Sequence, residues 1–322
     1  MKKYIYSAMI LAAAAIAMPS QAQKKVNLNK GDVKVETVEL NDGDYIAIGR
    51  PEGVPTQRPV EITNTATTKN SIKYTILAKD ENVIGDQMVI SKAFVDLLMI
   101  QMGMDPATCT AEELEAVFKT LMQAGYGFAQ MGTQNYTVVN GEEDRNGETQ
   151  FILGGQDYYI VTDDLLYLND KFLFGPNMSH VIVTTPEAGE SSESLDVSYD
   201  GLDDNGRVNI SITPGANIKT LHVVLGTTRS IDQNISTYGY GYVIQEMGTN
   251  FTADQWNELK QEDKKWNVDK EDDYSILVLG VDNEGNWVKK QMDNIHIKPV
   301  ANNNCPDLNT DNFSIENANL SA

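Results

Sequence analysis

Hydrophobic and polar residues alternate along several short stretches of the chain, most clearly in the stretch that ends at Pro214. There Val208, Ile210 and Ile212 are expected on one face of an extended backbone, with the polar residues between them on the other. A repeat of two residues is typical of an antiparallel strand with one buried face. Because proline cannot donate a backbone hydrogen bond, the strand is predicted to end at Pro214. The pattern therefore predicts a half-buried strand after an acidic turn at Asp203–Gly206.

The same arrangement of strand, acidic turn, strand and proline occurs twice. The first copy runs from Val35 to Pro51 and the second from Val197 to Pro214. A further strand is predicted at Ser71–Ala78 in the first copy and at Asn217–Gly226 in the second. Only the first copy has a long polar loop before this strand, from Glu52 to Asn70. Such a loop is the largest predicted difference between the two copies.

Helical patterns are found between the predicted strands of both copies. In the first copy, Val89–Gly103 is predicted to form a largely buried helix that glycine ends. Thr110 begins a second helix, with Glu113 at the third position as a capping box. In the second copy, Thr252 and Gln255 have the same spacing and predict another capped helix.

The stretches around the two capping threonines resemble each other. Ile100–Leu114 and Ile244–Trp256 each contain an apolar segment, a glycine, a short loop and a capping threonine in the same order. We interpret these stretches as one structural unit that is used twice. The sequence thus predicts a duplicated module with a helix set between its strands.

Each copy is also predicted to close with a hairpin. In the second copy the strands are Ile276–Val281 and Trp287–Lys290, joined by a turn at Asn283–Gly285. In the first copy Tyr158–Thr162 and Lys171–Phe174 have the same pattern. Closing hairpins in both copies strengthen the prediction of antiparallel sheets.

The short strands separated by turns, the proline after the second strand and the tyrosines Tyr159 and Tyr274 near the penultimate strands resemble fibronectin type III-like, or immunoglobulin-like, domains. The resemblance covers about Asp32 to Pro299 and includes a helix-containing subtype found in bacterial exported surface proteins. It implies a mainly β fold with helical insertions, arranged as two tandem antiparallel β-sandwich domains. It implies no particular activity, because this fold has many functions.

The N-terminus has the pattern of a signal peptide. Lys2 and Lys3 precede an apolar run at Ala8–Met18, and small residues follow it up to Ala22. The run is too short to span a bilayer, so we expect an exported protein without membrane insertion, in the periplasm, on the cell surface or secreted. The predicted divisions are a signal peptide at 1–22, a first sandwich with the larger helical insert at 23–186, a linker at 187–194, a second sandwich with the shorter insert at 195–299, and a polar tail at 300–322.

The chain is strongly acidic, with a formal net charge of -21. This balance argues against a nucleic-acid partner, which requires a positive surface. The only two cysteines are Cys109 and Cys305. In an oxidising compartment they either form a disulfide or remain free thiols, and their spacing does not decide between these outcomes.

No catalytic motif is present in the sequence. HExxH, GxSxG and Cys/His signatures are absent, so we expect no enzymatic activity, no cofactor and no catalytic metal. The acidic turns at Asn41–Asp44, Asp203–Gly206 and Asp269–Asp273 lack the spacing of an EF-hand loop, and their residues are common turn formers. One alternative remains, a glycoside hydrolase whose carboxylates meet only in the folded chain.

Two aromatic clusters are the candidate binding residues. Tyr238, Tyr240 and Tyr242 would share one face if their backbone were extended, and Tyr126 and Phe128 form a smaller cluster. Aromatic rings beside small residues suit sugar rings and peptide surfaces. We therefore predict a non-catalytic binding or adhesion protein that presents the loops of two β-sandwich domains to a glycan or protein partner. The alternative is a structural spacer or assembly subunit of a cell-surface complex.

Overall fold

The computed structural model describes residues 24–30, 33–40 and 60–299, apart from residues 80, 82, 146, 169–170 and 176–177. Strands β1 (Lys24–Lys30) and β2 (Val33–Leu40) pair with each other in an antiparallel ribbon. The predicted signal peptide, most of the strand predicted before Pro51, Cys305 and the polar tail lie outside the described residues. Below, residues 60–186 are called the first half and residues 195–299 the second half.

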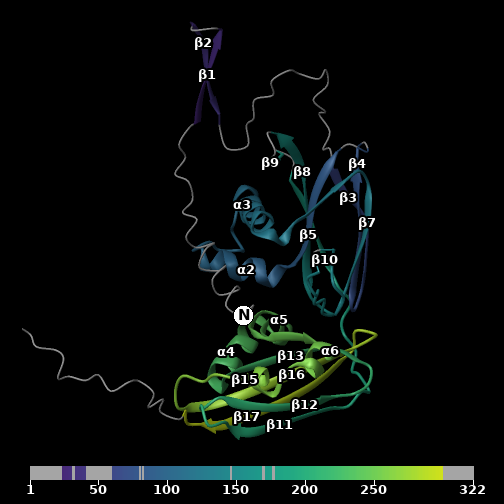
Figure 1. Ribbon diagram of the computed structural model, residues 1–322, viewed down its shortest axis with the longest axis vertical. Helices are drawn as coiled ribbons and strands as arrows, with labels where there is room; N and C mark the ends of the chain where they lie inside the picture. The colour runs from purple at the N-terminus through teal and green to yellow at the C-terminus, as the bar shows by residue number, and fades with distance from the viewer. Residues whose placement is uncertain are drawn as a thin grey trace, which may run out of the picture.

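The first half contains two antiparallel sheets and a layer of helices (Figure 1). One sheet has the order β3 (Val60–Thr68), β4 (Ser71–Ala78), β7 (Gln134–Val139). The other has the order β10 (Ser179–Thr184), β8 (Asp157–Leu168), β5 (Ile84–Ser91), β6 (Phe128–Met131), and β9 (Lys171–Phe174) also pairs with β8. Helices α2 (Lys92–Gln101) and α3 (Ala111–Leu121) and the short π-helix η1 (Met122–Tyr126) connect β5 to β6.

Two hydrophobic cores hold these layers together. One lies between the two sheets and includes Ile72, Ile76 and Ile160. The other lies between the second sheet and the helices and includes Met88 and Phe118. The second sheet therefore packs against a core on each face, which explains the apolar runs Met88–Ile90 in β5 and Tyr158–Val161 in β8.

The second half has the same layers. One sheet has the order β11 (Leu195–Leu202), β12 (Val208–Pro214), β15 (Lys265–Trp266), and the other has the order β14 (Thr249–Thr252), β13 (Ile218–Thr227), β16 (Asp272–Asp282), β17 (Trp287–Ile297). Helices α4 (Thr228–Tyr238) and α5 (Tyr240–Met247) connect β13 to β14, and α6 (Ala253–Glu258) and the 3-10 turn η2 (Gln261–Lys264) follow. One core lies between the sheets and another between β13, β16 and the helix pair.

The two halves repeat one topology. In chain order, β3, β4, β5, two helices, β6, β7, β8 and β10 correspond to β11, β12, β13, two helices, β14, β15, β16 and β17. The strands also occupy the same places in the two sheets of each half. The predicted mainly β fold with antiparallel sheets and helical insertions is confirmed. The closing hairpin with its turn at Asn283–Gly285 is also confirmed, since β16 pairs antiparallel with β17.

The correspondence that the sequence analysis assigned between the copies is wrong by one strand. Ser71–Ala78 is β4, which corresponds to β12 and its Val208, and not to the strand at Asn217–Gly226. The part of the predicted loop at residues 60–68 is strand β3, while 52–59 lie outside the described residues. Only Val60 of β3 is buried, so this threonine-rich strand lacks the alternating apolar residues that would have revealed it.

The two capping boxes are confirmed, but they are not equivalent. The hydroxyls of Thr110 and Thr252 accept from the backbone N–H of Glu113 and Gln255, whose side chains bond back. However, the helix at Thr110 precedes β6, whereas the helix at Thr252 follows β14. The interpretation of these stretches as one repeated unit is therefore wrong, because a short capping signal recurs wherever a helix begins.

The caps that do correspond lie directly after the third strand of each half. Ser91 ends β5 and caps α2 by accepting from the N–H of Phe94. Thr227 ends β13 and caps α4 by accepting from the N–H of Ser230. Because Ser91 belongs to β5, helix α2 begins three residues later than the predicted start at Val89.

The halves differ most in the connection that leads into their long central strand. Residues 140–156, which we call the connecting segment, join β7 to β8, while only residues 267–271 join β15 to β16. The connecting segment contacts the second half at several places. Asn140 donates from Nδ2 to Thr220 Oγ1 at 2.9 Å, and Glu142 pairs with Lys219 at 2.9 Å. Leu153 is fully buried in the helix-side core of the second half.

A second contact between the halves is made by two turns. Lys69 Nζ donates to Asn286 Oδ1 at 2.7 Å, and Asn70 Nδ2 donates to the carbonyl of Asn283 at 2.8 Å. These residues belong to the β3–β4 turn and the β16–β17 turn. The halves are thus joined through these turns as well as through the connecting segment.

Candidate functional site

A pocket of about 800 Å³ lies where the connecting segment, the edge of the first-half sandwich and helix α5 meet. Its walls come from β4, β5, α2, η1, β6 and β7 of the first half, and from α5 and β14 of the second half. Ligand pockets usually have volumes of about 300 to 1,000 Å³. The size and the location between two units therefore make this pocket the candidate site.

One wall of the pocket is aromatic. The rings of Phe94 and Tyr126 lie 6.0 Å apart at an angle of 39°. On another part of the wall, the guanidinium of Arg145 lies 5.7 Å from the centre of the Phe128 ring and 5.1 Å from that of Tyr136. Tyr126 is 38% exposed, so its ring is accessible to a ligand.

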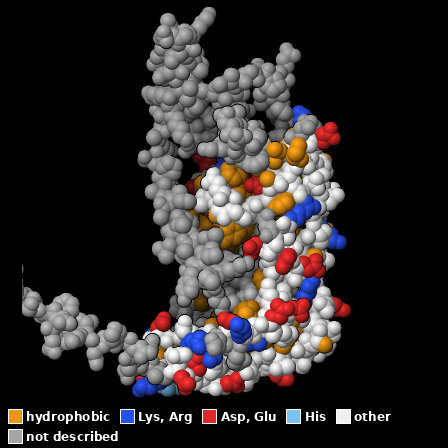
Figure 2. Space-filling model, in the orientation of Figure 1, with side chains coloured by type: hydrophobic (Ala, Val, Ile, Leu, Met, Phe, Trp, Pro, Cys, Tyr) orange, Lys and Arg blue, Asp and Glu red, His pale blue; other side chains and the backbone are white. Residues whose placement is uncertain are grey.

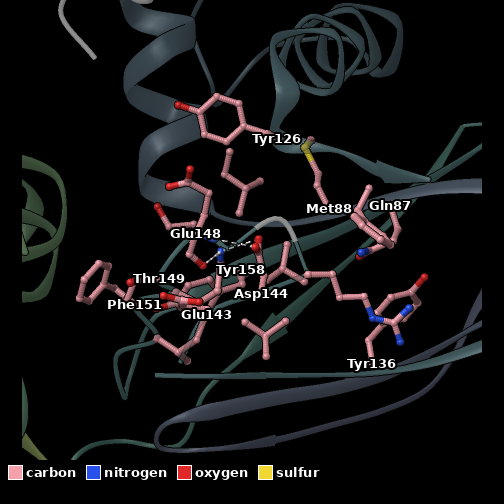
Figure 3. A pocket seen from close by; sticks show the side chains of 18 of the residues that line it. Gln87, Met88, Tyr126, Tyr136, Glu143, Asp144, Glu148, Thr149, Phe151 and Tyr158 are labelled. Carbon is pink, nitrogen blue, oxygen red and sulfur yellow. Dashed lines mark hydrogen bonds between the residues drawn. The ribbon is translucent and has the colours of Figure 1, made fainter. Parts of the chain in front are cut away.

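The connecting segment brings three carboxylates to the pocket. Glu143, Asp144 and Glu148 line it, and Figure 3 shows Asp144 and Glu148 between Tyr126 and Tyr136 in that view. Asp144 fixes the turn, because its carboxylate accepts from the N–H of Glu148 at 3.0 Å and from Gln150 Nε2 at 2.9 Å. These bonds shape the segment locally and leave Glu143 and Glu148 exposed.

A fourth carboxylate, Glu246, reaches the pocket from α5. It accepts a hydrogen bond of 2.5 Å from the hydroxyl of Ser91, the residue that caps α2 in the other half. Burial raises the pKa of Glu246 to about 7, although the Ser91 hydrogen bond acts in the opposite direction. No ion pair joins Glu246 to a lysine or arginine in the described part of the chain.

The floor of the pocket is connected to a buried polar network. Asn250 lines the pocket and bonds His222 Nδ1 at 2.7 Å, and His222 Nε2 lies 3.3 Å from the hydroxyl of Thr220. Thr220 in turn accepts from Asn140 of the connecting segment at 2.9 Å. Burial lowers the pKa of His222 to about 4, so the imidazole is neutral at neutral pH. A neutral His222 then donates from Nδ1 to Asn250 Oδ1.

Tyr158 forms a second polar link between the halves. Its hydroxyl accepts from the N–H of Leu153 at 2.7 Å and from Gln245 Nε2 of α5 at 3.2 Å. Burial raises the pKa of Tyr158 well above its usual range, so the phenol stays protonated. The other polar atom of the Gln245 amide is buried beside the pocket and has no protein partner. An unsatisfied polar atom in this place is available to a polar ligand.

The structure divides the predicted binding residues. Tyr126 and Phe128 line the pocket. Tyr238, Tyr240 and Tyr242 do not, and their backbone is not extended, because α4 ends at Tyr238 and α5 begins at Tyr240. The expectation that these three tyrosines share one face is therefore wrong.

The three tyrosines have different surroundings. Tyr238 stacks on Tyr242 with ring centres 4.7 Å apart. Tyr240 packs inward against Trp287, and Lys289 Nζ lies 4.5 Å from the centre of its ring. Glycines at this place gave the stretch a loop-like pattern, but Gly239 only separates two helices at a positive φ of 89°.

The other candidate groups lie elsewhere. Cys109 is partly buried near the start of α3 and forms no disulfide within the described part of the chain, and its pairing with Cys305 stays a prediction. In the acidic turn, hydrogen bonds from the Arg207 N–H, Lys265 and the Asn205 N–H hold the pKa of Asp203 well below its usual range. Among the described residues, no cluster of three metal-ligating side chains occurs and no helix is long and apolar enough to span a membrane.

Sequence reasoning missed several buried titratable groups. Asp86 and Asp163 lie opposite each other on β5 and β8, and both are almost fully buried. Burial raises the pKa of Asp86 to about 6, and burial together with the charge of Asp164 raises that of Asp163 to about 8. Asp163 could have been noticed, because it interrupts an apolar run of the sequence. Glu246 was also missed, and no comparable sequence signal marks it.

Comparisons with known proteins add little to this picture. No protein-family model and no curated protein matches the chain. A solved two-domain fibronectin type III segment of chicken tenascin is similar over 73% of this chain and 98% of its own length, with 7% identity and a TM-score of 0.22. A TM-score this low does not support an argument. The description as two antiparallel β-sandwich units therefore rests on the sheets and cores of the molecule itself.

Proposed function

We propose that the chain is an exported, non-catalytic binding protein that receives part of a glycan or protein partner in the pocket between its two halves. The observation that supports this most is the combination of an accessible ring, Tyr126, with the partly buried carboxylate of Glu246 in one pocket of about 800 Å³. Rings and polar groups that converge in a concave site are the usual features of a recognition pocket.

The rigidity of the junction supports the same proposal. The pocket walls are fixed by hydrogen bonds across the halves, such as Ser91 to Glu246 and Asn140 to Thr220. A preformed pocket binds with less loss of conformational entropy than one that must be ordered. A simple spacer would not require an unpaired carboxylate at its domain junction.

A second candidate is a carboxylate-based glycoside hydrolase. The observation that favours it is the raised pKa of Glu246, about 7, in a pocket that also contains Glu143, Asp144 and Glu148. A carboxyl with a raised pKa in one site with a second carboxyl is the arrangement that acid catalysis of glycoside cleavage uses. Release of reducing sugar from a bound polysaccharide, abolished by Glu246→Gln, would establish this activity.

The test compares two exposed tyrosines. Binding of wild type, Tyr126→Ala and Tyr238→Ala is measured on a panel of polysaccharides and peptides. Tyr126 is 38% exposed and Tyr238 48%, so neither change should unfold the protein. Loss of the pocket ring should weaken binding by about tenfold, the size typical of an important aromatic contact, while Tyr238→Ala should have little effect.

The reverse result, with binding lost in Tyr238→Ala and kept in Tyr126→Ala, would contradict the pocket as the site. If no probe binds and the protein forms a stable oligomer, the alternative of a structural or assembly subunit is favoured. Melting temperatures of both variants should be measured to show that they remain folded.

A further inference from the structure

We propose that the pocket receives an arginine side chain of a basic protein partner, and that the Glu246 carboxylate is the counter-ion of its guanidinium. This inference rests on the proposed function, because it assigns the chemistry of the ligand to the same pocket.

The pocket wall already holds one guanidinium of the chain itself. Arg145 lies 5.7 Å above the ring of Phe128 and 5.1 Å above that of Tyr136. Arginine favours the faces of aromatic rings because its flat cation is attracted by their electron density. The second aromatic pair, Phe94 and Tyr126, lies on the same pocket and has the same character.

Glu246 is linked through Ser91 to the backbone of Phe94, a member of this second pair. The hydroxyl of Ser91 accepts from the N–H of Phe94 at 2.9 Å and donates to the Glu246 carboxylate at 2.5 Å, so one side chain links the glutamate to the start of α2. A hydroxyl satisfies only part of a carboxylate, which can accept several hydrogen bonds. A guanidinium offers two parallel N–H groups to the remaining lone pairs.

The charge of the pocket and of the whole chain favours a cation. Four carboxylates line the pocket, those of Glu143, Asp144, Glu148 and Glu246, against the single guanidinium of Arg145. The chain has a formal net charge of -21, and Figure 2 shows acidic side chains over both halves. Such a surface attracts basic proteins and increases their rate of association.

An arginine fits these features better than an amino sugar. Both bring a cation, but the guanidinium is planar, so one group can both stack on a ring and pair with a carboxylate, and this pocket offers Tyr126 and Glu246. An ammonium group is a compact, strongly hydrated point charge that has neither a flat face to stack on a ring nor a rigid pair of parallel N–H groups. Amino sugars are nevertheless a separate source of positive charge, so the experiment includes them.

The experiment measures binding of small probes by calorimetry. The peptide acetyl-Gly-Arg-Gly-amide is compared with its neutral citrulline analogue, and chitotriose with its fully N-acetylated, neutral form. We expect the arginine peptide to bind at least about tenfold more tightly than the citrulline peptide, since only arginine forms a charge-assisted pair. Chitotriose should bind more weakly than the arginine peptide.

The matched variants are Glu246→Gln and Glu258→Gln. Glu258 is exposed on α6 and does not line the pocket, so its neutralisation should leave binding of the arginine peptide unchanged. Glu246→Gln has almost the same shape and should reduce that binding by about tenfold, to the level of the citrulline peptide.

Equal binding of the arginine and citrulline peptides, or preference for chitotriose, would overturn the arginine assignment and leave the pocket as a binding site. Absence of binding by every probe would also overturn it. In that case the Tyr126→Ala comparison on the wider panel decides separately whether the pocket binds anything.

Discussion

The two halves of the molecule have the same strands in the same order, yet only the first half carries the connecting segment. Between β7 and β8 the first half has residues 140–156, whereas residues 267–271 make the equivalent connection in the second half. The extra residues supply three pocket carboxylates and Leu153, which is buried in the other half. The two halves therefore share the sheets and cores of one topology, whereas the connecting segment, which only the first half has, supplies part of the candidate site.

A second comparison concerns equivalent positions in β5 and β13. Asp86 precedes the cap Ser91 by the same spacing at which His222 precedes the cap Thr227, and both side chains are buried. The pKa of Asp86 is raised to about 6 and that of His222 is lowered to about 4, in both cases mainly by burial. Burial at this position of the fold thus disfavours the charged form of an acid in one half and of a base in the other.

The largest effect is expected from Leu153→Ala. Its side chain is fully buried among residues of the second half, so truncation should lower the free energy of unfolding by about 2–5 kcal/mol. Chemical denaturation of wild type and variant measures this loss. Leu77, which is 45% exposed, provides the control, and Leu77→Ala should change stability by less than about 0.5 kcal/mol. Equal effects of the two changes would show that the connecting segment is not anchored by Leu153.

The equivalent acids and bases should respond to pH in opposite directions. His222 has a lowered pKa, so its contribution to the free energy of unfolding is present above pH 6.5 and is lost as pH falls towards 4. Asp86 has a raised pKa, so its contribution to the free energy of unfolding is present below pH 3.8 and is lost as pH rises through 6. Between pH 7.5 and 4.5, His222→Gln should therefore lose less stability than wild type, and Asp86→Asn should lose more.

Each of these two differences should be about 1–3 kcal/mol, because one unit of pKa shift corresponds to about 1.4 kcal/mol. Urea unfolding at the two pH values measures them. The raised pKa of Glu246 affects all three proteins equally and cancels in the comparison. Parallel pH profiles for wild type and both variants would contradict the assignment.

The equivalent caps offer a finer comparison. Thr227→Ala removes one helix cap and should cost about 1 kcal/mol. Ser91→Ala removes the corresponding cap and also the hydrogen bond to partly buried Glu246, so it should lower the free energy of unfolding by about 1 kcal/mol more. Denaturant unfolding at pH 8 measures both losses, and equal values would show that the Ser91–Glu246 contact contributes nothing across the junction.

The smallest effect is expected from Arg145→Ala. This change removes the positive charge from the pocket and uncovers the rings of Phe128 and Tyr136. Binding of acetyl-Gly-Arg-Gly-amide should tighten by about threefold, since the competing internal cation is gone. Weaker binding would indicate that Arg145 contacts the ligand directly.

Much of the fold could be predicted because its signals are local. The alternation at Val208–Ile212 predicted β12, and the Thr110 and Thr252 caps predicted the helices that begin there. Periodicity and capping depend on neighbouring residues in the chain. For the same reason, these signals could not show which segments of the two halves correspond, and the assignment that they suggested was off by one strand.

The candidate site was largely beyond sequence reasoning. Glu246 reads as an ordinary solvated helix residue, and the sequence does not show that it is partly buried and bonded to Ser91 of the other half. The connecting segment reads as a polar loop, and Leu153 gains its role only from the core into which it inserts. Tyr126 and Phe128 were selected for their rings, whereas their neighbours in space come from distant segments.

Hydrogen exchange of the wild-type chain, with and without saturating acetyl-Gly-Arg-Gly-amide, tests the central claim most directly. If the ligand enters the pocket between the halves, amides in residues 143–152 and 244–250 should exchange more slowly on binding, while those in β11 and β12 should not change. Protection confined to residues 238–242 or to the outer sheet of the second half, or no protection at all, would contradict the claim.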